Sequence, residues 1–231
     1  QKEGNTLKNL VRNLSRAATE HGSSTSLSLK LWQKLQELAP DDREAEEALN
    51  KLAGEAADPA VLVEHLRNKL ESVQGEKRLM VLLQLADILA TKMEQVEEAA
   101  TILAQASEEF STDSNLWRKL AGYYAALQQV EQQQAALNSL LSLLGEGEER
   151  NATLVELAAV ELLQGQPAVA VTRVEEVLHA DTGNTDAIEV MEKIVPQLGG
   201  EDKIGAMQTL AKAYQAAQRF AQAIAALQSL M

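Results

Sequence analysis

One pattern of residues returns at nearly even intervals along this chain. A large residue is followed three positions later by the pair Leu-Ala and then by a fourth residue, which gives the positions i, i+3, i+4 and i+7. These four positions lie on one face of an α-helix. The Leu-Ala pair begins at residues 52, 85, 120, 157 and 210, so the intervals are 33, 35, 37 and 53 residues. The clearest copies are Leu82, Leu85, Ala86, Leu89; Trp117, Leu120, Ala121, Tyr124; Leu154, Leu157, Ala158, Glu161; and Met207, Leu210, Ala211, Tyr214.

Each copy begins a unit of two helices, as residues 207–230 illustrate. A very short turn follows the stripe that starts at Met207, and a second apolar stripe begins at Phe220 and ends at Leu230. Two amphipathic helices cannot bury both stripes against each other alone, so every pair must pack on the pairs before and after it. The sequence therefore predicts a stack of helix pairs.

The composition also favours helices. Hydrophobic residues make up 45% of the chain but aromatic residues only 3%, and no run of β-branched residues alternates with polar ones. We predict an all-α fold of about 12 helices, counted from the pattern and its spacing.

The repeated pattern resembles the tetratricopeptide repeat (TPR). In that repeat a large residue, then Leu-Gly or Leu-Ala, then Tyr mark the first helix, and Ala and an aromatic residue mark the second. The resemblance implies a right-handed α-solenoid of helix-turn-helix repeats of about 34 residues each. The first three intervals then hold one repeat each, whereas the last is longer by about 19 residues, roughly one helix and its loop.

We expect residues 1–231 to form a single TPR-like array. The clearest repeats are placed at about residues 76–112, 114–145, 151–182 and 204–231, degenerate repeats at 5–40 and 43–75, and the extra helix at about 185–198.

The resemblance also implies where a partner would bind. In TPR proteins the first helices line the concave face, and the positions that point into it correspond here to Met80, Leu83, Asp87, Asn115, Arg118, Gly122, Ala152, Val155, Ala159 and Leu162. A TPR module that clamps a peptide carboxylate places Lys and Asn in this groove, whereas here Arg118 is followed by Gly122. The small and apolar residues suit a partner helix or apolar segment better.

The net charge of the chain argues against nucleic-acid binding. The formal net charge is -13 and the pI about 4.7, so the chain would repel a phosphate backbone and would favour a basic partner. The one concentrated basic feature is Lys8, Arg12 and Arg16, spaced i, i+4 and i+8. We interpret it as the solvated outer face of a helix, with docking to an acidic partner or to lipid headgroups as the alternative.

Residues typical of catalysis or metal binding are not clustered in the sequence. The three histidines, His21, His65 and His179, show no metal-ligand spacing, and we interpret them as helix-end or surface residues. No phosphate-binding loop occurs, and cysteine is absent. We interpret residues 181–186 as a turn, the cluster Glu146, Glu148 and Glu149 as a solvated helix start, and Trp117 as a core residue. We therefore predict no enzyme activity, no cofactor and no metal.

These observations favour a non-catalytic scaffold that binds a protein or peptide on its concave face, within a bacterial multiprotein assembly. Two alternatives remain open: a regulatory repeat segment of a larger enzyme or signalling protein, and a structural protein that self-associates through its C-terminal helix. No segment approaches the about 18 apolar residues that a membrane span needs. The expected location is cytoplasmic, with the periplasm as the alternative.

Overall fold

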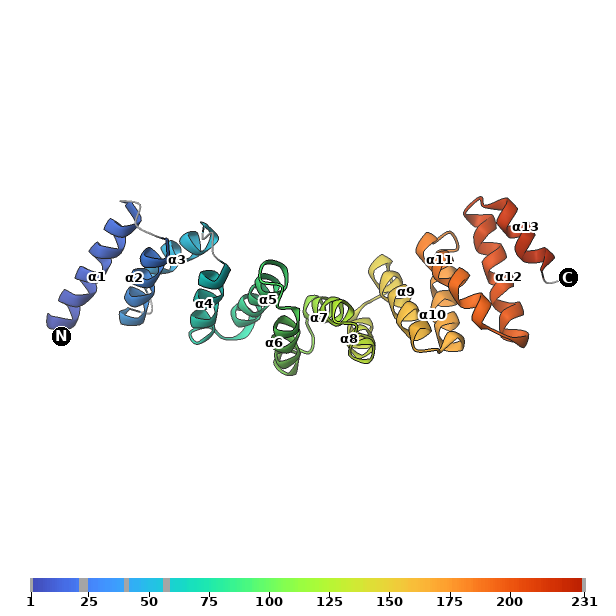
Figure 1. Cartoon of the computed structure of the whole chain (residues 1–231), viewed down its shortest axis with the longest axis horizontal. Coiled ribbons are helices and arrows are strands. Elements are labelled where there is room, and N and C mark those ends of the chain that lie inside the picture. The colour runs from blue at the N-terminus through green and yellow to red at the C-terminus, as the bar shows by residue number, and fades with distance from the viewer. Residues whose placement is uncertain (1, 21–24, 40–41, 56–58, 230–231) are drawn as a thin grey trace. The chain divides into compact units, whose positions relative to one another are not determined.

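The computed structural model describes residues 2–20, 25–39, 42–55 and 59–229. Within these ranges every regular element is helical, with 13 α-helices and one short 3₁₀ helix and no strand (Figure 1). The predicted all-α fold is confirmed. The chain divides into two compact units, Gln1–Ala106 and Ser107–Met231. No helix in the described ranges combines the length and the apolar character that crossing a membrane requires.

The first unit is built from helices that pack on their neighbours in sequence, α1 on α2, α2 on α3, α3 on α4 and α4 on α5. One core cluster brings together Val11 of the first helix, Trp32 and Leu35 of the second, and Leu49 of the third. The helices are α1 Lys2–Glu20, α2 Thr25–Leu38, α3 Arg43–Glu55, α4 Pro59–Leu70, α5 Gly75–Lys92 and α6 Val96–Glu109, the last of which runs into the second unit.

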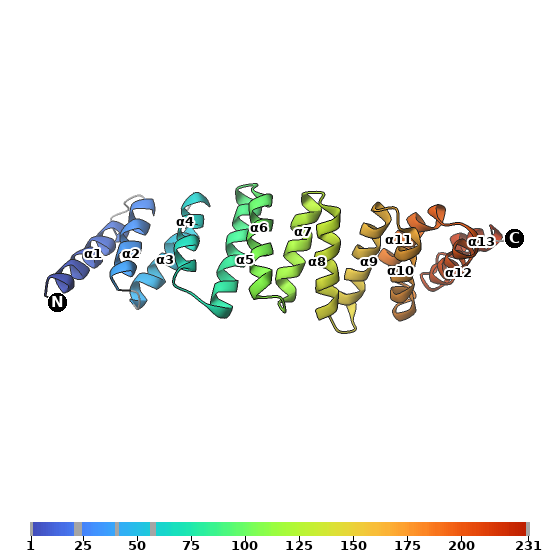
Figure 2. The same ribbon diagram turned by 90° about the horizontal axis from the view of Figure 1, so that it is seen from below.

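In the second unit each helix from α7 to α13 also packs on its neighbours, and in addition α9 contacts α11 and α10 contacts α12. The two helices of a pair lie side by side, as α7 and α8 do in Figure 2. The elements are α7 Ser114–Ala126, α8 Val130–Leu143, α9 Glu148–Leu163, α10 Pro167–Ala180, α11 Thr185–Ile194, η1 Val195–Gln197, α12 Gly200–Ala216 and α13 Phe220–Gln228.

A similar turn joins the two helices of a pair in four places, and the turn after α5 is one residue longer than the other three. One residue in each turn has a left-handed backbone, with φ of 57° at Glu94, 57° at Gln128, 72° at Gly165 and 60° at Gln218. The N–H of the next residue then donates to the carbonyl of the fourth pattern residue. These bonds close the end of the first helix, and they are Gln95 to Leu89 (2.8 Å), Gln129 to Tyr124 (2.9 Å), Gln166 to Glu161 (2.9 Å) and Arg219 to Tyr214 (2.7 Å).

The Leu-Ala pair of the pattern is buried in each of these four copies. Trp117, which we placed in the core, is only half-buried, and its indole N–H donates to the carbonyl of Ser111 at 2.8 Å. Glu161, in the fourth pattern position, is buried and lies 3.5 Å from the guanidinium of Arg173. The buried pairs are Leu85 and Ala86, Leu120 and Ala121, Leu157 and Ala158, and Leu210 and Ala211.

The long fourth interval holds one extra helix, α11, followed by the 3₁₀ helix η1. Asn184 caps α11, because its side-chain oxygen accepts a hydrogen bond from the backbone N–H of Ala187 at 3.0 Å. The apolar face of α11 is fully buried against α9, α10 and α12. The added residues therefore extend the core of the second unit.

The basic stripe on α1 is not simply solvated, which corrects our interpretation. Arg12 pairs with Asp42, and Arg16 makes two hydrogen bonds to Glu44, at 2.5 and 2.6 Å. Burial is the largest single influence and acts to raise the pKa of Asp42. The hydrogen bonds from Arg12 and from the backbone of Ala45 and Glu44, together with the charge of Arg12, outweigh it, so the pKa lies below its usual value. The hydrogen bond from Arg16 likewise lowers the pKa of Glu44. The two arginines therefore attach α1 to the start of α3.

His65 on α4 is buried, whereas we expected an exposed or helix-end residue. Only 4% of its surface is exposed, and its Nε2 atom has no hydrogen-bond partner among the described residues. Burial, with a smaller contribution from the charge of Lys69, lowers its pKa from 6.5 to about 4. His65 is therefore held in its neutral form at neutral pH.

We predict that acid destabilises the first unit through His65. Because its pKa is lower in the folded than in the unfolded chain, its contribution to stability is complete above pH 6.5 and is lost as pH falls toward 4. Near pH 5 the loss should be about 1–2 kcal/mol of unfolding free energy.

Urea unfolding of the wild type and of His65→Leu at neutral pH and near pH 5 measures this loss. The variant should lose less stability on acidification than the wild type does. His179→Leu removes an exposed histidine of α10 and is the matched control. Equal acid sensitivity of the wild type and His65→Leu would contradict the prediction.

Candidate functional site

The first helices α7 and α9 of the second unit carry seven of the ten residues predicted for partner binding. An ion pair between Arg118 of α7 and Glu149 of α9 joins the two helices. Both side chains are about half exposed, at 49% and 52%, so the pair lies at the surface. The guanidinium of Arg118 therefore already has a carboxylate partner.

On α7 the predicted residues Asn115, Arg118 and Gly122 are all exposed. A Cβ atom built on Gly122 would meet nothing within 4 Å, so the space beside this residue is open. Ala125, one turn further along, is exposed as well. This side of α7 therefore presents backbone and small side chains to solvent.

On α9 the predicted residues differ in exposure. Ala152 is exposed, Ala159 and Leu162 are half-buried, and Val155 is 9% exposed. Val155 belongs to the core cluster of the second unit, where its side chain packs among residues of the following helices. We call the accessible small residues the small-residue face, which consists of Asn115, Gly122, Ala125, Ala152 and Ala159.

The remaining three predicted residues lie on α5 in the first unit. Met80 is exposed, and Leu83 and Asp87 are half-buried. The carbonyl of Asp87 accepts a hydrogen bond from the hydroxyl of Thr91 at 2.6 Å. These residues form a surface of the first unit and are treated separately from the small-residue face.

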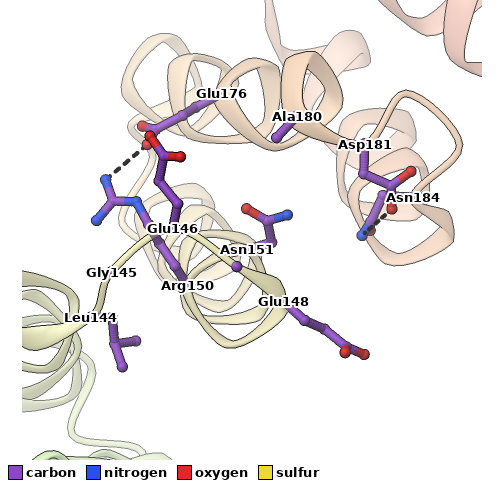
Figure 3. A pocket seen from close by; sticks show the side chains of 11 residues that line it. Leu144, Gly145, Glu146, Glu148, Arg150, Asn151, Glu176, Ala180, Asp181 and Asn184 are labelled. Carbon is purple, nitrogen blue, oxygen red and sulfur yellow. Dashed lines mark hydrogen bonds and ion pairs between the residues drawn. The ribbon is translucent and has the colours of Figure 1, made fainter.

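A pocket of about 860 Å³ lies beside the start of α9, and sequence analysis missed it. The loop between α8 and α9 contributes Glu146 from one side, and the loop between α10 and α11 contributes Asp181 and Asn184 from the other (Figure 3). Gly147 lets the chain turn into α9, since its φ of 147° is a conformation that favours glycine. Sequence analysis identified the turn at residues 181–186 and the helix start with Glu146, Glu148 and Glu149, but not that the two lie close together in the fold.

Arg150 holds this pocket together. Its guanidinium donates to the carbonyl of Leu141 at 3.4 Å and to the carboxylate of Glu176 at 2.8 Å, so α9 is tied to both α8 and α10. On the opposite side Asn184 donates to Asp181 at 3.3 Å (Figure 3). The pocket walls are therefore fixed by polar contacts within the chain.

The pocket is acidic. Its lining contains the carboxylates of Glu146, Glu148, Glu176 and Asp181 against the single guanidinium of Arg150. In the described part of the chain, no group of three or more His, Cys, Asp or Glu residues is placed to hold a metal ion. The charge of the pocket therefore suits a basic side chain of a partner.

We predict that Arg150 contributes to stability through Glu176. Replacing Arg150 by Met should lower the unfolding free energy by about 1 kcal/mol, since the pair is partly exposed and screened by solvent. Urea unfolding of Arg150→Met, Glu176→Gln and the double variant gives the coupling between the two side chains. Lys203→Met, an exposed cation on α12, is the control. Strictly additive effects would contradict the prediction.

No family model matches the sequence, and no curated protein matches it. Solved structures similar to this chain include MamA from Desulfovibrio magneticus RS-1, residues 41 to the end, at TM-score 0.47 and 16% identity, covering 77% of this chain and 97% of that one. The C-terminal part of a TPR repeat-containing protein from Cytophaga hutchinsonii is similar at TM-score 0.47 and 13% identity, covering 96% and 93%. TPR-like repeats of a kinesin light chain from Podosopora anserina are similar at TM-score 0.46 and 18% identity, covering 96% and 92%.

Two of these three proteins are described as TPR-like or TPR repeat-containing. The chain itself consists of paired helices, and the first helix of these pairs carries the four-residue pattern. A turn with a left-handed residue follows, and the carbonyl of the fourth pattern residue accepts a hydrogen bond from this turn. The protein therefore has a TPR-like, all-α repeat fold.

Proposed function

We propose that this protein is a non-catalytic scaffold that binds a helix or peptide of another protein on the small-residue face of α7 and α9. Small side chains let a partner backbone approach closely, and a helix laid along such a face contacts it every third or fourth residue. The corresponding surface of the first unit, with Met80, Leu83 and Asp87, is included in the proposal as a second contact surface.

The observation that carries this proposal is Gly122. It lies in the interior of α7, where glycine is less favourable than alanine by about 1 kcal/mol. Its φ is not positive, and a Cβ atom would have open space around it, so neither the backbone nor internal packing requires glycine. Close approach of a partner backbone gives a reason for the missing side chain.

The charges on the protein support a partner segment with basic side chains. The chain has a net charge of -13, and the acidic pocket lies at the start of α9, next to Ala152. Arg118 is paired with Glu149, which leaves it poorly suited to bind the carboxylate of a peptide. Association should therefore weaken with increasing salt.

We predict that Gly122→Ala stabilises the protein and weakens partner binding. The substitution should raise the unfolding free energy by about 1 kcal/mol, because alanine is the better helix former and its Cβ meets no other atom. The added methyl group should increase the dissociation constant for the partner, because it occupies the closest part of the contact. Thermal or urea unfolding and a binding isotherm measure the two effects on the same sample.

The partner is found by comparing three forms of the protein as affinity baits in extracts of the cell of origin. The binding variant is Gly122→Glu with Ala152→Glu, at exposed positions of α7 and α9. The matched control is Ala135→Glu with Ala168→Glu, at exposed positions of the second helices α8 and α10. Circular dichroism confirms that all three keep the same helix content.

A specific partner should be retained by the wild type and by the α8/α10 control and lost from the α7/α9 variant. Recovery of the same proteins by all three baits would show that the small-residue face is not the binding surface. Gly122→Ala binding the partner as tightly as the wild type would remove the reason given for the glycine.

A further inference from the structure

In the described part of the chain, three ion pairs follow one another at a fixed interval. Each joins an arginine to a glutamate 28 or 31 residues further on, which lies on the second helix after it. The arginines are spaced 51 residues apart, which is about one and a half TPR-like repeats. The spacing indicates that these pairs belong to the repeat. They are Arg16 of α1 with Glu44 of α3, Arg67 of α4 with Glu98 of α6, and Arg118 of α7 with Glu149 of α9.

These ion pairs are weak because they lie at the surface. All six side chains are between 41% and 53% exposed. An ion pair with such exposure adds little to stability, and salt screens the attraction between its charges. A change in the surrounding ions is therefore enough to shift such a pair between its closed and open forms.

The ion pair between α7 and α9 lies within the small-residue face. Arg118 is one turn from both Asn115 and Gly122 on the same side of α7, and Glu149 is one turn before Ala152 on α9. Helix α8 packs on both α7 and α9, whereas this ion pair joins α7 to α9 directly. We call it the α7–α9 strap. It crosses the surface on which the partner segment is proposed to lie.

We infer that the α7–α9 strap regulates access to the small-residue face. When closed, it holds α7 and α9 together and places two long charged side chains among the small ones. A basic side chain of the partner competes with Arg118 for Glu149, so that binding and salt both open the strap. This regulatory role rests on the proposed function, whereas the strap itself is present without a partner.

The distance between α7 and α9 tests the strap in the absence of any partner. The chain contains no cysteine, so Ala126→Cys and Leu163→Cys place one spin label on each helix, at exposed positions far along the helices from the strap. Electron paramagnetic resonance gives the distance distribution between the labels. From about 10 mM to about 1 M salt the Debye length falls from about 30 Å to about 3 Å, and the distribution should broaden and lengthen by about 2 Å.

Charge variants of the labelled protein show whether the ion pair is the cause. Arg118→Gln should give the long, broad distribution already at low salt and should not respond to added salt. Arg118→Glu combined with Glu149→Arg re-forms the pair with reversed charges and should restore both the short distance and its salt dependence. Lys203→Gln removes an exposed cation of α12 and should behave like the wild type. Circular dichroism confirms that each variant folds.

The same Arg118→Gln substitution, without labels, tests the effect on binding. At low salt the variant should bind the partner about two- to fivefold more tightly than the wild type, because the strap no longer has to open. Low salt is used because salt also screens the attraction between the acidic protein and its partner.

The outcomes separate the strap from the proposed function. An unchanged distance in Arg118→Gln at low salt, or a charge-reversed variant that stays open, would refute the strap whatever the affinity baits retain. A changed distance with unchanged partner affinity would refute its regulatory role. Recovery of the same proteins by all baits, with the distances changing as expected, would refute the proposed function and with it the regulatory role, but not the strap.

Discussion

The burial of the alanine of each Leu-Ala pair, together with small residues of the second helix, is what the rest of the structure depends on. Ala158 on α9 and Ala170 on α10 are both fully buried in one cluster, and Ala211 and Ala223 are buried in the pair α12 and α13. A larger side chain at such a contact overpacks it at a cost of about 1–3 kcal/mol. Three residues after this alanine, the carbonyl of the fourth pattern residue accepts the hydrogen bond that ends the first helix.

This contact also determines which surfaces are left for other molecules. When the two helices of a pair pack together, the second helix still has an apolar stripe, and the next first helix must cover it. The covered examples are Leu137 and Val174, and the open one is Leu227. The outer side of a first helix has no such obligation, so Gly122 and Ala152 can be small without loss of core. The packing of helix pairs therefore leaves two kinds of surface: the apolar stripe of a second helix and the small-residue side of a first helix.

Sequence periodicity predicted the parts of the structure that neighbours along the chain determine. The spacing of the Leu-Ala pair located the first helices and the extra segment that forms α11, because helix faces repeat locally. Periodicity could not show that Val155 is buried or that His65 lies inside, because the burial of a residue outside the repeated pattern depends on how the helices pack on one another. The pairing of Arg12 with Asp42 was missed for the same reason: the two residues are 30 positions apart. The acidic pocket is formed by two loops that only the fold brings together.

A single small and weakly apolar face offers few of the large buried anchors that dominate binding energy, so one copy should bind one partner segment weakly. The proposed function includes a second contact surface on α5, with Met80, Leu83 and Asp87. A partner with several suitable segments would then gain affinity from effective concentration instead of from new contacts.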